Sequence, residues 1–247
     1  MRMTLGVVLL LSAYAAFGQS VPPSTSITVD CNKGQSLNQT LAKLNRQTPY
    51  SVSVNGTCTE FVQVIGFHNL VVKALPGATL VQPSTGGGNL INSTLFIESS
   101  QSVQVEGFSV QGNSGALANI GIGHGSTDIR LRSLNVQGGN AGGIIIFENS
   151  QVSIAYVHVQ DVGFQSVGIY DSSDVHVEHC LFENTTSDGW HQAISVGASH
   201  VTMYATTIRN MQQAIGGGPI PSSIWLSTTR TTPPVATPTS SSTVRLV

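Results

Sequence analysis

The sequence predicts an all-β protein: a right-handed parallel β-helix with three strands per coil, about six to seven coils and an N-terminal capping helix. Two observations predict this fold. Gly, Ser, Thr, Asn and Val are abundant and helix formers are scarce, a composition typical of short strands joined by turns. In addition, short segments in which apolar and polar residues alternate recur along the chain at a regular spacing.

The first residues have the pattern of a secretory signal peptide. Arg2 is followed by an apolar run from Leu5 to Leu11 and then by small residues, with cleavage expected after Ala15 or Gly18. The run is too short to span a membrane, and no later segment has about 18 consecutive apolar residues. We therefore assign residues 1–18 to a signal peptide and expect a secreted protein, extracellular or periplasmic.

The charge of the remaining chain argues against nucleic acid as a partner. Without Arg2, nine basic residues face twelve acidic ones, and only 9% of all residues are charged. Lys is absent after Lys73, so no basic patch is expected for nucleic acid or anionic lipid.

Export permits disulfides, and the chain has three cysteines. Cys31 and Cys58 bracket the first structured segment and are expected to pair. Cys180 is then left over. We expect it to be a small buried hydrophobic residue, and the alternative is a reactive thiol, for which no basic partner is evident nearby.

A helix is expected near residues 34–45, where Leu37, Leu41 and Leu44 have helical spacing. Such a helix would cover the open end of the first coil and prevent edge-to-edge pairing. The next segment, residues 50–83, reads as one or two coils with less regular alternation.

The regular repeat begins near residue 95 and gives three apolar pairs per unit, one for each strand. The middle pairs recur at steps of 26, 23, 23 and 26 residues, at Val103/Val105, Ile129/Leu131, Val152/Ile154, Val175/Val177 and Val201/Met203. The preceding pairs are Leu95/Ile97, Ile120/Ile122, Ile144/Ile146, Val167/Ile169 and Ile194/Val196. The following pairs are Phe108/Val110, Leu134/Val136, Val157/Val159, Cys180/Phe182 and Thr206/Ile208.

One unit cannot bury its own apolar face, but stacked units can, with about 4.8 Å between coils. We assign residues 19–226 to this β-helix domain and call its strands first, second and third sheet in the order of the three pairs. The Thr/Pro/Ser-rich residues 227–247 are expected to be a disordered tail. Because no C-terminal cap is recognisable, the chain could also be a truncated fragment.

The stretch SVGIYDSSDVHVEHCLFEN, residues 166–184, resembles the repeat of the pectin lyase-like superfamily of right-handed parallel β-helices. The N-terminal segments GQSLNQTL and VNGTCTEFVQV are similar to those of secreted bacterial members, and the resemblance covers roughly residues 30–220. That superfamily includes lyases, hydrolases, esterases, epimerases, adhesins and phage tailspikes, so the resemblance implies a fold but no single activity.

In that superfamily, polysaccharide lies along the outer face of the first sheet, beside the variable turn. The resemblance therefore implies a carbohydrate site on that face. Its predicted substrate-binding residues are Trp190, Tyr170, Phe147 and His124, and its predicted catalytic residues are Asp171, Glu148, Asp188 and His191. No metal ligand is assigned.

These residue types suit a sugar. Aromatic rings stack on sugar faces, and two carboxylates one coil apart can act as acid and base or share a Ca²⁺ ion. The alternative is that His124, Glu148 and Asp171 are solvated turn residues and that Phe147 and Tyr170 are an ordinary exposed pair.

No family motif identifies the reaction. The triplet Gly123–Gly125 (GHG) is similar to one in polygalacturonases, but their other motifs are missing, and no Arg or Lys is expected on the first-sheet face for a pectate-lyase reaction. We therefore expect a protein that binds or acts on an extracellular polysaccharide, for example a pectin- or uronate-type polymer, and as an enzyme it would be a lyase or glycoside hydrolase. The alternative is a structural or adhesin-like solenoid.

Overall fold

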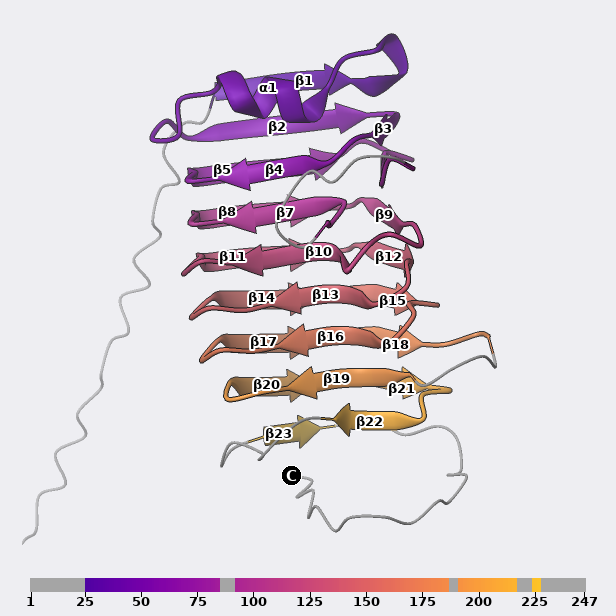
Figure 1. Cartoon of the computed structure of the whole chain (residues 1–247). Helices are drawn as coiled ribbons and strands as arrows, with labels where there is room; N and C mark the ends of the chain where they lie inside the picture. The colour runs from indigo at the N-terminus through magenta and orange to yellow at the C-terminus, as the bar shows by residue number, and fades with distance from the viewer. Residues whose placement is uncertain (1–24, 85–91, 187–190, 217–223, 228–247) are drawn as a thin grey trace, which may run out of the picture.

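The chain coils into a stack of seven turns of parallel β-helix, with a helix at its N-terminal end (Figure 1). The structure is a computed structural model and describes residues 25–84, 92–186, 191–216 and 224–227. Within each coil the chain passes from one sheet to the next, so every strand pairs in parallel with its equivalents in the neighbouring coils. The predicted three strands per coil are confirmed.

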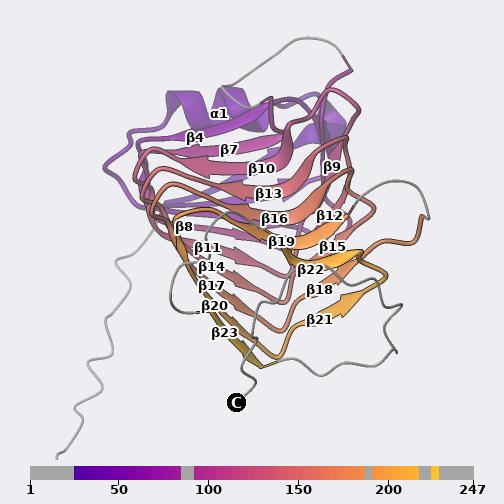
Figure 2. The ribbon, with the colours of Figure 1, turned by 60° about the horizontal axis from the view of Figure 1, so that its bottom comes forward.

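Three sheets enclose the core, and we number them as in the sequence. Sheet 1 contains β4 (Val62–Ile65), β7 (Leu95–Glu98), β10 (Ala118–Gly123), β13 (Gly142–Ile146), β16 (Gln165–Ile169), β19 (Gln192–Val196) and β22 (Gln213–Gly216). Sheet 2 contains β1 (Thr25–Asp30), β2 (Tyr50–Asn55), β5 (His68–Ala74), β8 (Gln101–Glu106), β11 (Thr127–Arg132), β14 (Gln151–Ala155), β17 (Asp174–Glu178), β20 (His200–Tyr204) and β23 (Ile224–Ser227). Sheet 3 contains β3 (Thr57–Thr59), β6 (Thr79–Val81), β9 (Ser109–Gly112), β12 (Asn135–Gly138), β15 (His158–Gln160), β18 (Leu181–Glu183) and β21 (Thr207–Arg209). Figure 2 shows how the three sheets face one another around the axis.

The core consists of columns of apolar side chains that run along the stack. In sheet 1 the strand register aligns Ile97, Ile122, Ile146 and Ile169 on four successive coils, and all four are fully buried. The equivalent column of sheet 2 is Val105, Leu131, Ile154 and Val177. Both columns agree with the pairs predicted from the repeat, because inward positions alternate with outward ones along each strand.

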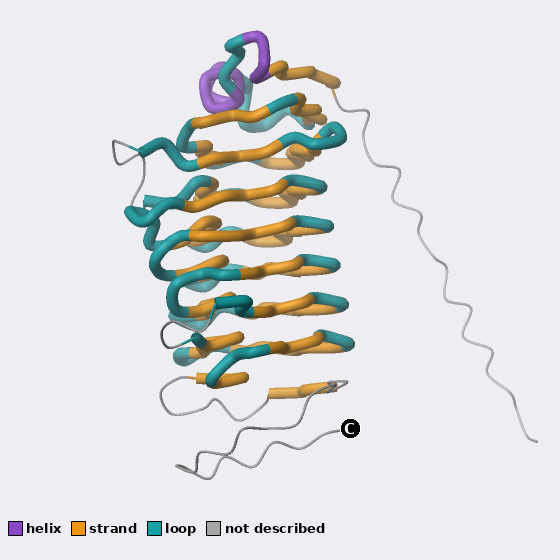
Figure 3. The backbone as a smooth tube through the Cα atoms, turned by 90° about the vertical axis from the view of Figure 1, so that its right-hand side faces the viewer, coloured by secondary structure: helices purple, strands orange, loops and turns teal. Residues whose placement is uncertain are grey.

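The N-terminal helix α1 (Leu37–Lys43) lies over the first coil, as Figure 3 shows at one end of the stack. Leu37 and Leu41 are fully buried in the core. The Asn38 side chain accepts a hydrogen bond of 3.0 Å from the backbone N–H of Gln63 in β4, which is the edge strand of sheet 1. The helix therefore covers the apolar end of the coil and binds one backbone N–H of its edge strand, as a cap must.

Glu60 fixes the start of this helix. Its carboxylate accepts hydrogen bonds from the backbone N–H groups of Leu37 (2.7 Å) and Asn38 (3.2 Å), and from the Ser36 hydroxyl. An acidic group at this position satisfies N–H donors that have no partner inside the helix.

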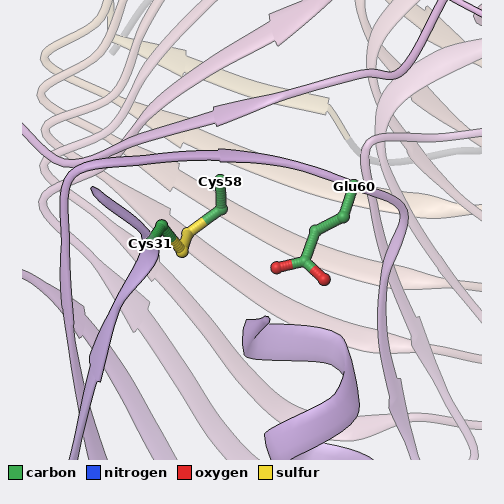
Figure 4. A group of neighbouring side chains, drawn as sticks. All are labelled: Cys31, Cys58 and Glu60. Carbon is green, nitrogen blue, oxygen red and sulfur yellow. A yellow bond between two sulfur atoms is a disulfide. The ribbon is translucent and has the colours of Figure 1, made fainter. Parts of the chain in front are cut away.

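The predicted disulfide is present: Cys31 and Cys58 are bonded, with 5.2 Å between their Cα atoms. The bond links the short 3-10 helix η1 (Cys31–Lys33) to β3, beside Glu60 (Figure 4). Within the described ranges, these three residues are the one group whose possible ligand atoms lie close enough together to hold a metal ion. Because both thiols are bonded and the carboxylate caps α1, we assign no metal there.

A ladder of buried serines holds the corner between sheets 1 and 2. The Ser173 hydroxyl accepts from the backbone N–H of Ser150 (3.2 Å) and donates to the carbonyl of Tyr170 (2.9 Å). The same arrangement recurs where the N–H of Ser173 donates to Ser199 (3.1 Å). The members Ser100, Ser126, Ser150, Ser173 and Ser199 are at most 5% exposed. The ladder therefore provides hydrogen bonds for backbone groups that the sheets leave unpaired at this corner.

Cys180 is the free cysteine of the described residues and is buried, as predicted. The described part of the chain contains no helix that is long and apolar enough to cross a membrane. The predicted signal peptide and the predicted tail beyond Ser227 lie outside the described residues.

Candidate functional site

The outer face of sheet 1 carries two aromatic rings that lie across glycines. Phe147 directly follows β13, and its ring covers Gly123 of the preceding coil, where an added Cβ would be 2.5 Å from two ring carbons. The same ring stacks on Phe96, with 6.4 Å between the ring centroids. Phe147 therefore keeps only 9% of its surface exposed. It lies on the predicted face, but most of the ring is already in contact with the protein.

Tyr170 occupies the register position of Phe147 one coil further on. Its ring is half-buried and lies against Gly168 and Gly197. Its hydroxyl donates to the Gln165 side chain at 2.7 Å and lies 3.1 Å from the Ser195 hydroxyl. The ring is thus held flat and fixed on the sheet, as a preformed binding surface requires.

Next to this face, a column of turn residues runs along the corner between sheets 1 and 2. The strand register aligns His124, Glu148 and Asp171 on three successive coils, as the sequence predicted. Each has a positive φ angle, of 53°, 56° and 57° respectively. Left-handed backbone is the shared geometry of this corner, since Ser99 and Ala198, in the coils before and after, also have it.

His124 joins two carboxylates from neighbouring coils. Its Nδ1 lies 2.5 Å from Glu98 Oε1, and its Nε2 lies 3.0 Å from Glu148 Oε2. The three side chains are between 27% and 45% exposed. An ionised carboxylate can only accept hydrogen bonds, so a ring that donates to both would carry a proton on each nitrogen. Both nitrogens of His124 are therefore engaged by the protein, which argues against His124 as a free base.

The column carries carboxylates without a neighbouring Lys or Arg in the contacts of the described residues. The arginines of the repeat lie elsewhere: Arg130 and Arg132 are in β11 of sheet 2, and Arg209 is in β21 of sheet 3. Carboxylates accept strong hydrogen bonds from hydroxyl donors. The corner thus suits a ligand rich in hydroxyl groups.

The other predicted residues are placed differently or lie outside the description. His191 is buried and precedes β19, so it lies at the opposite end of sheet 1 from the acidic column, which follows the strand ends. Its Nδ1 is 3.0 Å from the carbonyl of Val162. Asp188 and Trp190 lie outside the described residues. The predicted roles of all three remain predictions.

The sequence reading did not include Glu98 and Phe96. Both lie in β7, in positions that alternate with the inward-facing Leu95 and Ile97. The sequence could have indicated Phe96 through Gly121, which is in register with it on the next coil, because a glycine leaves room for a large neighbouring ring. Glu98 is in register with Gly123, but it lies one position before the turn column, and its contact with His124 depends on the reach of its side chain.

Comparison with known proteins supports the fold. The sequence profile described as "Right handed beta helix region" matches residues 85–232, more than half of the chain. Two solved structures are similar: a mutant pectin methylesterase in complex with a hexasaccharide (9% identity, 79% of this chain and 82% of that chain, TM-score 0.47), and pectin methylesterase PemA from Erwinia chrysanthemi (10% identity, 80% and 81%, TM-score 0.39). At this sequence identity, and with TM-scores below 0.5, the two enzymes say nothing about the activity of the present chain. No curated protein matches its sequence.

Proposed function

Since the chain belongs to the family of right-handed β-helix proteins, we propose that it binds an extended extracellular polysaccharide on the outer face of sheet 1 and along the adjoining acidic corner. The observation that carries the proposal is the contact of Glu98, His124 and Glu148 across three coils, with Asp171 in register on the next coil. These side chains form one line along the stack, which matches a ligand that extends across coils.

The aromatic face beside this line supports the same ligand class. Tyr170 offers a fixed, half-buried ring, and Trp190 remains a predicted second stacking residue. Sugar hydroxyls can donate to Glu148 and Asp171, while the sugar ring packs on the aromatic face. A line of carboxylates repels an anionic chain, so the units bound here would be neutral, as in a methyl-esterified uronate polymer.

Cleavage of a glycosidic bond is the second candidate function. It is favoured by the register of Glu148 and Asp171, which occupy equivalent turn positions on adjacent coils. Two carboxylates that flank a glycosidic bond can act as acid and as base or nucleophile. His124 is less suited to proton transfer, because each of its nitrogens faces a carboxylate.

Export to an oxidising compartment is part of the proposal. The Cys31–Cys58 disulfide supports it, because such bonds persist mainly outside the cytosol. The signal peptide assigned to residues 1–18 stays a prediction from the sequence.

Binding is tested by titrating the mature protein with polygalacturonate, its methyl ester and a neutral galactan in a calorimeter. We expect the methyl ester or the galactan to bind, and the variants Glu148→Gln and Asp171→Asn to weaken that binding. Glu106→Gln, in sheet 2, is the matched control and should bind like the wild type. If none of the polymers binds, a structural or adhesin-like solenoid becomes the better description.

Cleavage is tested in the same samples by following the release of new reducing ends. If it occurs, both carboxylate variants should abolish it while the fold, measured by thermal unfolding, is unchanged. Binding without release of reducing ends leaves the binding function alone.

A further inference from the structure

A second row of side chains runs along a different corner, where sheet 2 turns into sheet 3. Two residues separate the strands there in each coil, and the register aligns the first of them, at Gly107, Ser133, Tyr156, His179 and Ala205. Arg132 and Tyr204 immediately precede this turn in their own coils. We call Arg132, Tyr156, His179 and Tyr204 the aromatic row. They come from four successive coils.

The members of the row contact one another. The Arg132 guanidinium lies 5.8 Å from the centroid of the Tyr156 ring. The Tyr156 and His179 rings are parallel, with 5.1 Å between centroids, and His179 meets Tyr204 edge-on at 5.7 Å. The row is therefore a continuous strip with a cation at one end.

This strip is exposed, and its polar atoms are available. Tyr156 is 52% exposed and Tyr204 is 54% exposed. Within the described residues, neither phenol hydroxyl has a hydrogen-bond partner, and Arg132 has no carboxylate within ion-pair distance. Arg130, two residues earlier on the same strand, differs in this respect because it pairs with Asp128 at 2.9 Å.

The backbone beneath the row is costly for such side chains. Tyr156 and His179 have φ angles of 57° and 51°, a left-handed conformation that favours glycine, and Gly107 fills the same turn position in an earlier coil. A bulky residue held in this region costs roughly 1–3 kcal/mol, and such outliers are enriched at functional sites. Ser133 and Ala205 have the same left-handed backbone at this position, with φ angles of 51° and 47°, so the turn itself sets the conformation and Tyr156 and His179 place large rings on it.

A groove continues the strip toward the N-terminal coils. Its volume is about 410 Å³, and its lining includes Gly107, Ser133, Thr79, Ser109, Asn135 and Tyr156. The turn residues here are small, so the surface is hollow where the aromatic row ends. The Oδ1 atom of Asn135 is buried and has no hydrogen-bond partner within the described part of the chain.

From this geometry we propose that the aromatic row and its groove form a second binding site, for a sugar chain that carries anionic groups. Aromatic rings with polar tips suit sugar rings and their hydroxyls. The unpaired Arg132 guanidinium suits a carboxylate or a sulfate, which it can bind through two parallel hydrogen bonds. The site is separate from the acidic corner of sheet 1, and its cation gives it the opposite charge preference.

The nearby carboxylates set a limit on the ligand. Glu106 and Glu178 are in the same register column as Arg132, but Glu106 accepts from Gln104 at 2.6 Å and Glu178 lies 3.6 Å from His176. Both carboxylates already contact other side chains, so Arg132 remains available to bind an anionic group of the ligand. A ligand with an anion on spaced units fits this arrangement better than a uniformly dense polyanion.

The test uses the mature full-length protein, isotope-labelled so that the ring signals of His179 can be followed by nuclear magnetic resonance. His179→Gln assigns those signals. The probes are a size-defined oligogalacturonate, its methyl ester and a sulfated galactan oligomer. We expect the His179 signals to shift with the oligogalacturonate or with the sulfated oligomer, and to shift far less with the methyl ester. The probe that causes the larger shift shows whether the site prefers a carboxylate or a sulfate.

Two variants and one control complete the test. Arg132→Gln and Tyr156→Gly should each weaken binding of the anionic probe roughly tenfold. Glycine suits the left-handed turn, so Tyr156→Gly removes the ring without endangering the fold, which the unfolding midpoint verifies. Arg130→Gln removes one positive charge from the same strand and should leave the affinity unchanged.

Three results would overturn the proposal: His179 signals that do not respond to any probe, equal shifts with the acid and its methyl ester, or equal losses in Arg130→Gln and Arg132→Gln. These results can be separated from a failure of the sheet 1 site. Glu148→Gln changes the sheet 1 site and leaves the aromatic row intact, so the response of His179 should be the same in that variant.

Discussion

The ring of Phe147 lies directly on the backbone of Gly123, one coil earlier, so that an added Cβ would be 2.5 Å from two ring carbons. The φ angle of Gly123 is outside the left-handed region, so alanine is acceptable to the backbone there. Gly123→Ala should therefore act by collision alone. We expect it to lower the free energy of unfolding by about 1–3 kcal/mol, as overpacking does, measured by chemical denaturation.

A double-mutant cycle isolates this contact. In a Phe147→Ala background the added methyl group meets no ring, so Gly123→Ala should cost much less there than in the wild type. An equal cost in both backgrounds would show that the ring does not occupy the space above Gly123.

The serine ladder makes a second stability prediction. Ser173→Ala removes the acceptor of the Ser150 N–H and leaves that buried donor without a partner. The expected loss is about 1–3 kcal/mol in the free energy of unfolding. Ser153→Ala is the control, because the Ser153 hydroxyl makes no side-chain hydrogen bond within the described residues. Comparable losses in the two variants would argue against the ladder.

The architecture was predictable because a β-helix repeats its inward pattern in every coil. The pairs at Ile122 and Ile146, or at Leu131 and Ile154, needed only a fixed spacing to be aligned, and the structure buries each of them. The capping helix and the disulfide were also predicted correctly. These features follow from local spacing, which a single sequence contains.

Much of the candidate site depends on side-chain reach between coils, which spacing does not give. The alignment placed His124 and Glu148 on one line, but Glu98 joins them from one position before the turn. The aromatic row was missed because Tyr156 and Tyr204 fall in the breaks between apolar pairs, one in the turn itself and one just before it. Aromatic residues at the breaks of consecutive coils were the available signal.

The disulfide gives a third prediction. Cys31 and Cys58 are 27 residues apart, and closing a loop of that length contributes on the order of 3 kcal/mol in the chain-entropy model. A Cys31→Ala/Cys58→Ala variant should lose about that much stability. A reductant should lower the stability of the wild type similarly and have no effect on the double variant. A wild type that does not respond to full reduction, verified by mass spectrometry, contradicts the prediction.

Cys180 gives the last prediction, which concerns alkaline pH. Burial raises the pKa of its thiol from 9.0 to about 11, opposed in part by hydrogen bonds with the backbone of Val157, Glu178 and Tyr156. Below pH 9 both the folded and the unfolded chain carry the thiol proton, so stability does not depend on this group. Between pH 9 and pH 11 the unfolded chain loses the proton while the folded chain keeps it, and stability therefore falls as pH rises.

The expected loss from this group is about 2 kcal/mol by pH 11. Other groups also titrate in this range, so the quantity to measure is the difference in pH dependence between the wild type and Cys180→Val, which has no ionisable group at this position. The free energy of unfolding of the wild type should fall more steeply above pH 9 than that of the variant, with the Cys31–Cys58 bond verified as intact at each pH. Parallel curves would contradict the prediction. They would mean that the thiol ionises as readily in the folded protein as in the unfolded chain, despite its burial in the core.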